Sequence, residues 1–286
     1  MLFIVKLKNL NKSYLLLNHM DLKFGFVVVE KPVEEYFDYA LKYKLTHLEI
    51  DLIKEHSFIE TFDTKRISNL RKLSKKFGIT LSLHTPYTIN PSDKIKIIRE
   101  ANIVYLKKCV LIANKLNATH VTTHIGYYNG LPSWTWLRKQ ALERLVISLK
   151  EVLRECKKFK VKLALENVNP MPKDSEFFYL GDNLKDFEFL FSKLKSPFLN
   201  LCLDVGHANT NEGPLAYIQK FGKKIINVHF HDNNGKYDEH LNVGEGNVPW
   251  KKVTDTLKKI KFFGPFISET LEAKPHESRD DLLKYF

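Results

Sequence analysis

The segment 224–246 concentrates imidazole and carboxylate side chains around the end of one expected strand. Its first half includes Ile225, Ile226, Val228 and Phe230, and His229 and His231 are two positions apart, so their side chains share one face of that strand. The loop that follows carries Asp238 and His240. Because such groups are costly to bury unless they are paired or bound to a metal, the segment predicts either a hydrogen-bonded polar loop or a metal site.

Histidines and carboxylates also occur where the neighbouring strands are expected to end. These residues are His84, His124, Glu166, Asp204, His207 and Glu269. With His229, Asp238 and His240 they provide five imidazoles and four carboxylates. That is more than a single zinc ion needs, since zinc is usually four-coordinate in proteins. The set suits two or three divalent cations with bridging carboxylates, and mixed donors of this kind fit Zn²⁺ or Mn²⁺ better than Mg²⁺.

Alternating strands and helices are expected to position these residues. We expect strands at 22–29, 46–52, 79–84, 119–124, 161–166, 198–204, 224–231 and 265–269, and helices at 34–44, 64–77, 91–117, 133–159, 182–194, 214–221, 249–260 and 278–285. This alternation predicts parallel strands joined by right-handed crossovers, and eight such units fit a (β/α)8 TIM barrel. A doubly wound open sheet is the alternative, although no G-x-G-x-x-G motif follows the first strand.

In a barrel, all of the donor residues would meet at one mouth. The longest expected connections, at 85–90, 126–132, 167–181 and 232–247, follow strands and therefore lie on the face where barrel enzymes carry their sites. Serine-hydrolase chemistry is disfavoured because the chain has no G-x-S-x-G motif. The arrangement predicts a metal-dependent enzyme.

The chain of 286 residues shows no linker and no break in composition. We therefore expect a single catalytic barrel domain over 22–286, preceded by an N-terminal extension at 1–21. Met20 is an alternative start of the protein, with the preceding residues as an extension.

The net charge of +12 suits a polyanionic partner such as nucleic acid. Most of this charge comes from lysines on expected helices, which is also typical of a solvated outer surface. Apolar runs are short and interrupted by charges, so we expect neither a membrane span nor a signal peptide. Three widely spaced cysteines indicate reduced thiols, which favours a cytoplasmic protein, and Cys202 is expected in a strand core.

Short motifs occur in order along the expected barrel. They are H-x-x-Y-x-x-N at 84–90, L-E-N at 165–167, C-x-D-x-x-H-A at 202–208, H-F-H-D at 229–232, D-x-H at 238–240 and G-E-G at 244–246. In this order they resemble endonuclease IV, the metal-dependent apurinic/apyrimidinic (AP) endonucleases. That family lies within the xylose-isomerase-like TIM-barrel superfamily, which also contains sugar isomerases and epimerases.

This resemblance implies a three-zinc site. It assigns His84, His124 and a bridging Glu166 to one ion, Asp204, His229 and Glu269 to a second, and His207, Asp238 and His240 to a third. The sugar-converting members use one or two ions and mainly four of these side chains, namely Glu166, Asp204, His229 and Glu269. The five additional donors favour the nuclease-like branch.

The resemblance also implies roles at the site. Glu166 is expected to bridge two metals, and Glu269 to orient or deprotonate the attacking water. Tyr87 is expected to pack near the abasic sugar. His231 stands where the family pattern H-x-N-D has Asn, and it is expected to contact the substrate or a metal ligand.

The sequence departs from the family in the segments that follow the metal motifs. His124-Ile-Gly126 replaces His-Pro-Gly, residues 168–172 replace a Gly-rich turn, and 53–62 lacks the Asn-x-Arg-x-Trp pattern that inserts into damaged DNA. The metal motifs thus match the family better than the DNA-reading segments do. On the strength of these metal motifs, the leading hypothesis is a multinuclear metal-dependent phosphodiesterase that cleaves DNA at abasic sites.

The alternative is a metal-dependent isomerase or epimerase acting on a small sugar or sugar phosphate. In that enzyme Glu166 and Glu269 would move a proton beside a carbonyl. Its pocket would need apolar walls, for which the candidates are Trp134, Trp136, Phe177 and Phe178.

Overall fold

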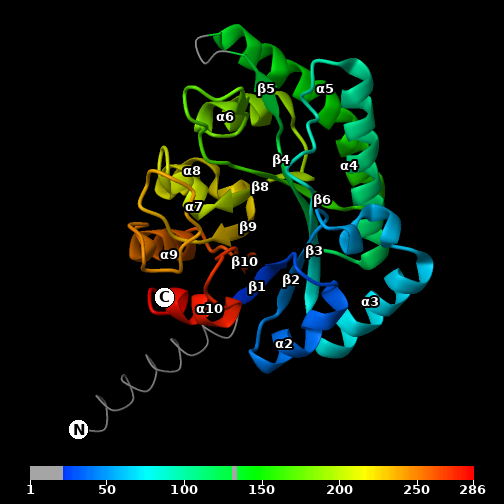
Figure 1. Cartoon of the computed structure of the whole chain (residues 1–286), viewed down its shortest axis with the longest axis vertical. Helices are drawn as coiled ribbons and strands as arrows, with labels where there is room; N and C mark the ends of the chain where they lie inside the picture. The colour runs from blue at the N-terminus through cyan, green and yellow to red at the C-terminus, as the bar shows by residue number, and fades with distance from the viewer. Residues whose placement is uncertain (1–21, 131–133) are drawn as a thin grey trace.

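The computed structural model describes residues 22–130 and 134–286, so the expected extension at 1–21 lies outside the described residues. Eight parallel strands form a closed barrel (Figure 1). They are β1 (Lys23–Val28), β2 (His47–Asp51), β3 (Thr80–His84), β4 (His120–His124), β6 (Lys162–Glu166), β8 (Leu199–Asp204), β9 (Ile225–Phe230) and β10 (Pro265–Ser268). Because β1 pairs with both β2 and β10, the predicted TIM barrel is confirmed and the open sheet is wrong.

Helices surround the barrel, as Figure 1 shows. They are α2 (Phe37–Lys42), which follows the 3-10 turn η1 (Val33–Tyr36), α3 (Thr64–Phe77), α4 (Lys96–Leu116), α5 (Thr135–Phe159), α6 (Leu184–Lys193), α7 (Val205–Asn209), α8 (Pro214–Phe221), α9 (Trp250–Lys259) and α10 (Pro275–Leu283). Over residues 22–130 and 134–286, none of these helices combines the length and the apolar character needed to cross a membrane.

Helices α4 and α10 begin several residues away from their predicted starts. Helix α4 begins at Lys96 rather than at 91, because the Asn90 and Asp93 side chains accept the backbone N–H groups of Ser92 and Ile95 and hold a turn there. Helix α10 begins at Pro275 instead of 278, since proline fits the first turn of a helix. Helix α3 has the predicted bounds, with Asp63 as N-cap and Gly78 at φ 68° as C-cap.

Three short elements over the barrel mouth were not expected from the sequence. Strands β5 (Tyr127–Asn129) and β7 (Phe177–Tyr179) pair antiparallel and tie together the loops that follow β4 and β6. Helix α7 follows β8 directly, and the Asp204 carboxylate accepts its backbone N–H at His207. These elements restrain the connections that carry site residues.

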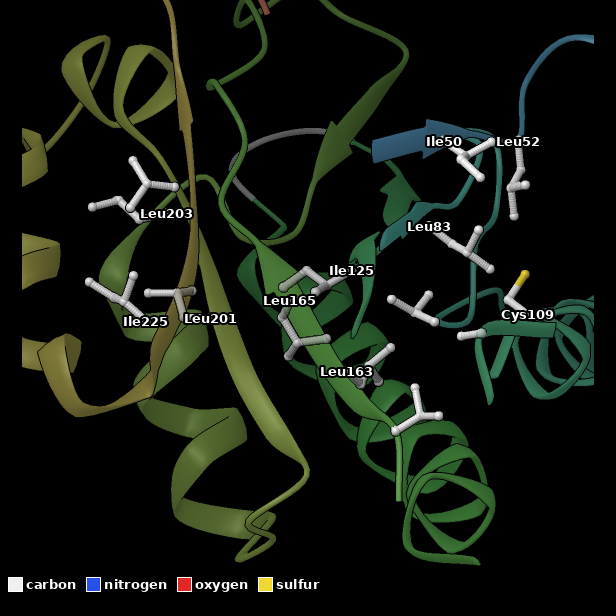
Figure 2. Packing of buried hydrophobic residues seen from close by; sticks show 14 of the residues in the cluster. Ile50, Leu52, Leu83, Cys109, Ile125, Leu163, Leu165, Leu201, Leu203 and Ile225 are labelled. Carbon is white, nitrogen blue, oxygen red and sulfur yellow. The ribbon is translucent and has the colours of Figure 1, made fainter. Parts of the chain in front are cut away.

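Side chains alternate between the two faces of each barrel strand. Figure 2 shows aliphatic residues of β6 and β8, among them Leu163, Leu165, Leu201 and Leu203, in the layer between the strands and the helices. These four leucines are fully buried, and burying each contributes roughly 2 kcal/mol. The intervening residues, including Glu166 and Asp204, therefore face the barrel interior. Cys202 is buried in β8, as expected.

Candidate metal centre

The carboxyl ends of the strands bring all nine expected donors to one mouth. His84, His124, Glu166 and Asp204 are the last residues of β3, β4, β6 and β8, and Glu269 follows β10 directly. Strand register places His124 opposite Glu166, and Asp204 opposite His229. His207 lies on α7, and Asp238 and His240 lie in the loop after β9. The parallel barrel thus gathers residues that are far apart in sequence.

The potential ligand atoms form five overlapping groups, and within each group they lie within 4.8 Å of one another. The three main groups are His84, His124 and Glu166; Glu166, Asp204, His229 and Glu269; and His207, His231, Asp238 and His240. The other two combine Glu49 with His84, His229 and Glu269, and Cys202 with Glu166 and His229. The three main groups correspond to the three ligand sets that the sequence resemblance implies, with His231 added to the third.

The Glu166 carboxylate lies between the first two groups. Its Oε2 is 2.8 Å from Nε2 of His84 and 3.5 Å from Nε2 of His124, while its Oε1 is 3.0 Å from Nδ1 of His229. The side chain is buried, so these contacts are shielded from solvent. A carboxylate whose two oxygens face different histidine groups has the geometry of a bridging ligand.

Backbone carbonyls orient three of the imidazoles. The contacts join Nδ1 of His84 to Thr85 O at 2.8 Å, Nδ1 of His207 to Asn167 O at 2.9 Å, and Nδ1 of His240 to Glu269 O at 2.7 Å. Because a carbonyl only accepts, Nδ1 must carry the proton in each case, and Nε2 of the neutral ring presents a lone pair to the cluster. This anchoring of the far nitrogen is common for histidines that bind metals.

Several buried polar atoms in the cluster lack a partner. Asp204 Oδ2, Asp238 Oδ1 and both ring nitrogens of His231 make no hydrogen bond within the part of the chain that the structure describes. Leaving such atoms unpaired is costly, whereas a cation among them satisfies the carboxylate oxygens and the imidazole lone pair together. Imidazole and carboxylate donors are the ligands of Zn²⁺ and Mn²⁺, so these residues fit a divalent metal centre.

The ionisable groups perturb one another strongly. Burial alone would raise the pKa of Glu166, but the adjacent His229, His124 and His84 hold it well below its usual range. Burial alone would lower the pKa of His84, but the Glu166 carboxylate raises it to about 10. Because an imidazole must lose a proton before it binds a metal, metal binding to this cluster is expected to release protons.

A cavity of about 310 Å³ opens above the cluster. Its lining comprises Asp51, His84, Tyr87, His124, Glu166, Val168, Asn169, Tyr179, His207, Asp238, His240 and Glu269. Tyr87 lines this cavity and is 52% exposed. His231 is fully buried, and its ring lies against Asp204 and Asp238.

The four aromatic residues expected to form the apolar walls of a sugar pocket do not line this cavity. They are Trp134, Trp136, Phe177 and Phe178. Trp134 and Trp136 stack on each other with ring centroids 6.2 Å apart, and both are about half exposed. Phe178 is buried beside Tyr128. The aromatic part of the lining comes from Tyr87 and Tyr179, and Tyr179 was not singled out in the sequence because its role depends on the pairing of β7 with β5.

Glu49 on β2 is a residue that the sequence reasoning missed. It is fully buried inside the barrel, and its Oε1 accepts a hydrogen bond from Nε2 of His229 at 2.7 Å. Its Oε2 accepts from Ser82, and more weakly from Thr122 and Asn227. Both oxygens are engaged, so Glu49 orients His229 and leaves Nδ1 of that ring directed at Glu166. The alternation of β2 was the available signal, since it turns Glu49 inward.

Asp51 at the end of β2 was also missed. It lines the cavity, and burial raises its pKa to about 6, because few neighbours compensate the loss of solvent. Its Oδ1 has no hydrogen-bond partner among the described residues. Asp51 is therefore an acceptor available to a bound molecule.

Comparison with known proteins finds a matching family and similar solved structures. A family model described as "Xylose isomerase-like TIM barrel" matches residues 37–285. Among solved structures, a D-tagatose 3-epimerase-like protein superposes with a TM-score of 0.80 at 26% sequence identity, covering 92% of this chain and 97% of that one.

Curated relatives point to more than one activity. An uncharacterized protein of Methanocaldococcus jannaschii is 28% identical, covering 78% of this chain and 75% of its own length. The fructoselysine 3-epimerase of Shigella flexneri is 23% identical over 78% of this chain and 79% of its own. The probable endonuclease 4 of Mycoplasmopsis synoviae is 26% identical over 66% of this chain and 68% of its own.

Proposed function

The chain belongs to the family of xylose isomerase-like TIM barrels, and we propose that it is a multinuclear metal-dependent phosphodiesterase of the endonuclease IV type, acting on DNA at abasic sites. The observation that carries this proposal is the third donor group, in which His207, Asp238 and His240 present ligand atoms within 4.8 Å of one another. A sugar-converting centre needs mainly the group around Glu166, so a further complete group indicates a larger metal centre.

The chain's own residues have distinct tasks in this proposal. Glu166 would help to hold the ions, and Glu269, whose carboxylate is 2.9 Å from Nδ1 of His229, would orient the attacking water and accept its proton. Tyr87 at the cavity rim contacts the sugar beside the phosphate. Divalent ions, when bound, supply Lewis acidity that stabilises charge on the oxygens of the phosphodiester.

The side chains that line the cavity carry carboxylates, and this charge is consistent with a centre that binds cations. The described residues that line the cavity include neither lysine nor arginine, whereas Asp51, Glu166, Asp238 and Glu269 contribute carboxylates. A phosphodiester is an anion, so these carboxylates would repel it unless they are neutralised. Cations bound by the histidine and carboxylate groups would neutralise these carboxylates, which is consistent with a multinuclear centre.

A ketose epimerase is the second candidate, and two observations favour it. The cavity of about 310 Å³ is within the range of small-molecule sites. In addition, Glu166 and Glu269 both reach Nδ1 of His229, at 3.0 and 2.9 Å, so two carboxylates lie close enough to move a proton on one small substrate. The similarity to the D-tagatose 3-epimerase-like protein supports the same alternative.

One assay separates the two functions. Protein loaded with zinc or manganese is incubated with a DNA duplex that carries one abasic site and, in parallel, with a panel of ketoses. We expect strand cleavage, and a loss on the order of 10²-fold in His240→Ala, because that change removes a charge-stabilising contact beside the reacting phosphate. His276→Ala, on the distant ring that stacks on Tyr43, serves as the matched control.

Two results would contradict parts of this proposal. Fully loaded wild-type protein that leaves the abasic duplex intact and epimerises a ketose would establish the second candidate instead. Cleavage that is the same in His240→Ala as in the control would keep the activity but remove the third donor group from the reaction.

A further inference from the structure

His231 is the most deeply buried imidazole of the third donor group. Its side chain is fully buried, and neither ring nitrogen has a hydrogen-bond partner among the described residues. Its Nε2 nevertheless lies 3.2 Å from Oδ1 of Asp204 and 3.6 Å from Oδ1 of Asp238. A buried polar ring directed at two carboxylates without a hydrogen bond is costly unless another partner lies between them.

The surrounding chain is shaped to hold this ring. A Cβ at Gly206 would lie 2.0 Å from Cε1 of His231, so only glycine leaves space for the imidazole. The opposite face of the ring stacks on His240 with centroids 3.9 Å apart, and His207 meets it edge-on at 5.5 Å. The position of the ring is therefore specific and not the result of loose packing.

We propose that His231 is the fourth protein ligand of the metal held by His207, Asp238 and His240. This inference rests on the metal centre proposed above and concerns a position at which the endonuclease IV pattern has Asn instead of His. The ligand atoms of all four residues lie within 4.8 Å of one another. Three imidazoles and one carboxylate would complete the tetrahedral shell that zinc prefers, and binding requires the nearly parallel rings of His231 and His240 to tilt so that both lone pairs point at one ion.

The ligand role accounts for the environment better than a substrate contact does. The cavity is lined by His207, Asp238 and His240, whereas His231 is fully buried and lies against Asp204 and Asp238. A substrate in the cavity therefore meets the other members of the group first. With four protein ligands, this metal would act mainly as a fixed positive charge at the cavity wall and would contact a phosphate oxygen only by adding a fifth ligand.

The proposal is tested by zinc retention in His231→Asn, which introduces the residue of the family pattern. Zinc-loaded protein is equilibrated with a chromogenic chelator at increasing concentration, and the zinc that remains per chain is measured by elemental analysis. We expect one zinc equivalent to be released from His231→Asn at a chelator strength about 10- to 100-fold lower than from wild type. His276→Asn is the matched control and should behave as wild type.

A second variant tests the same geometry from the other side of the ring. Gly206→Ala places a methyl group where His231 lies, so it should weaken the same zinc equivalent. In the His231→Asn background, the shorter side chain leaves room for the methyl group, and Gly206→Ala should then have little further effect. Such non-additivity is expected only if both changes act through one contact.

The cobalt-substituted protein provides a readout that does not depend on folding yield. Tetrahedral and six-coordinate Co²⁺ differ strongly in visible absorption, so loss of a protein ligand should reduce the tetrahedral band of one equivalent. Unchanged zinc retention and an unchanged cobalt spectrum in His231→Asn would overturn the inference while leaving the proposed activity intact. Conversely, a weakened equivalent in a protein without nuclease activity would support His231 as a ligand and refute the proposed function.

Discussion

Two layers of polar side chains inside the barrel differ in how their hydrogen bonds are satisfied. The lower layer lies around Glu49, His47 and Ser82, and the upper layer consists of the three main donor groups at the mouth. In the lower layer, Glu49 accepts from His229 through Oε1 and from Ser82 through Oε2. In the upper layer, at the mouth, Asp204 Oδ2 and Asp238 Oδ1 find no hydrogen-bond donor in the described chain. Oδ2 of Asp204 and Oδ1 of Asp238 are themselves buried, as Glu49 is, so exposure to solvent does not explain the difference.

Although both layers contain glutamate and histidine, the comparison indicates a structural role for the lower layer and a cation-binding role for the upper layer. In the lower layer each Glu49 oxygen has its own donor, and the atoms without a hydrogen-bond partner among the described residues are Oδ1 of Asn227 and Nε2 of His120, not carboxylate oxygens. The upper layer combines carboxylates and imidazoles whose remaining atoms need a cation. The layers meet at His229, whose Nε2 binds Glu49 while its Nδ1 faces Glu166 and Glu269.

The largest effect is expected from Glu166→Gln, which removes the carboxylate shared by two main donor groups of the upper layer. We expect the loss of more than one metal equivalent and a fall in phosphodiester cleavage of at least about 10²- to 10³-fold. Elemental analysis and the abasic-duplex assay measure the two effects. The exposed Glu272→Gln is the control, and wild-type metal content in Glu166→Gln would exclude a bridging role.

A smaller loss is expected from Glu49→Gln, which keeps the shape of the lower layer but removes its charge. A neutral amide oxygen accepts the N–H of His229 more weakly than a carboxylate oxygen does, so the orientation of that ligand weakens, and metal affinity should fall about 10- to 100-fold. Competition with a chelator measures this affinity. Equal affinity in Glu49→Gln and wild type would show that the two layers are not coupled through His229.

Metal removal should destabilise the upper layer specifically. An ion present at about 100 times its dissociation constant stabilises the fold by about 2.7 kcal/mol, so stripping the protein should lower its Tm by about 5 °C or more. Calorimetry with and without chelator measures the shift, and hydrogen exchange is expected to increase in the loop that carries Asp238 and His240. An unchanged Tm in verified metal-free protein would argue against a tight metal centre.

The smallest effect concerns pH and the lower layer. The ring nitrogens of His47 form hydrogen bonds with the hydroxyl groups of Thr80 and Ser82. Burial, and to a smaller extent the nearby His120, lowers the pKa of His47 to about 3. Since an unfolded histidine titrates near 6.5, the unfolded state binds the proton first, and the contribution of His47 to stability is complete above that pH and is lost as pH falls toward 3.

The variant His47→Gln isolates this contribution. In chelator-treated samples, the stability advantage of wild type over His47→Gln should shrink by up to about 1.4 kcal/mol per pH unit between roughly pH 6 and pH 4. Urea unfolding at a series of pH values provides the measurement. An advantage that does not change with pH would mean that His47 does not remain neutral in the folded protein.

The sequence was sufficient for the barrel because its signals are local. Each strand is a short apolar run that ends in a polar residue such as Glu166 or Asp204, and α3 carries its own caps at Asp63 and Gly78. The nine donor positions followed from the same signals, since residues that end parallel strands must meet at one mouth. Their proximity is therefore a consequence of topology.

The remaining features depend on contacts between distant segments. Glu49 reaches His229 across 180 positions, and β5 pairs with β7 only after the barrel has aligned their loops. Helix α7 spans Val205–Asn209, which is too short for helical periodicity to be recognised. The fit of His231 against Gly206 likewise depends on the packing of α7 beside the end of β9.

The number of metal ions bound per chain tests the account most directly. Wild-type protein loaded with zinc, freed of loosely bound ions and measured by elemental analysis is expected to retain three equivalents, one for each main donor group at the mouth. One equivalent per chain would instead contradict the multinuclear centre and favour the sugar-epimerase alternative.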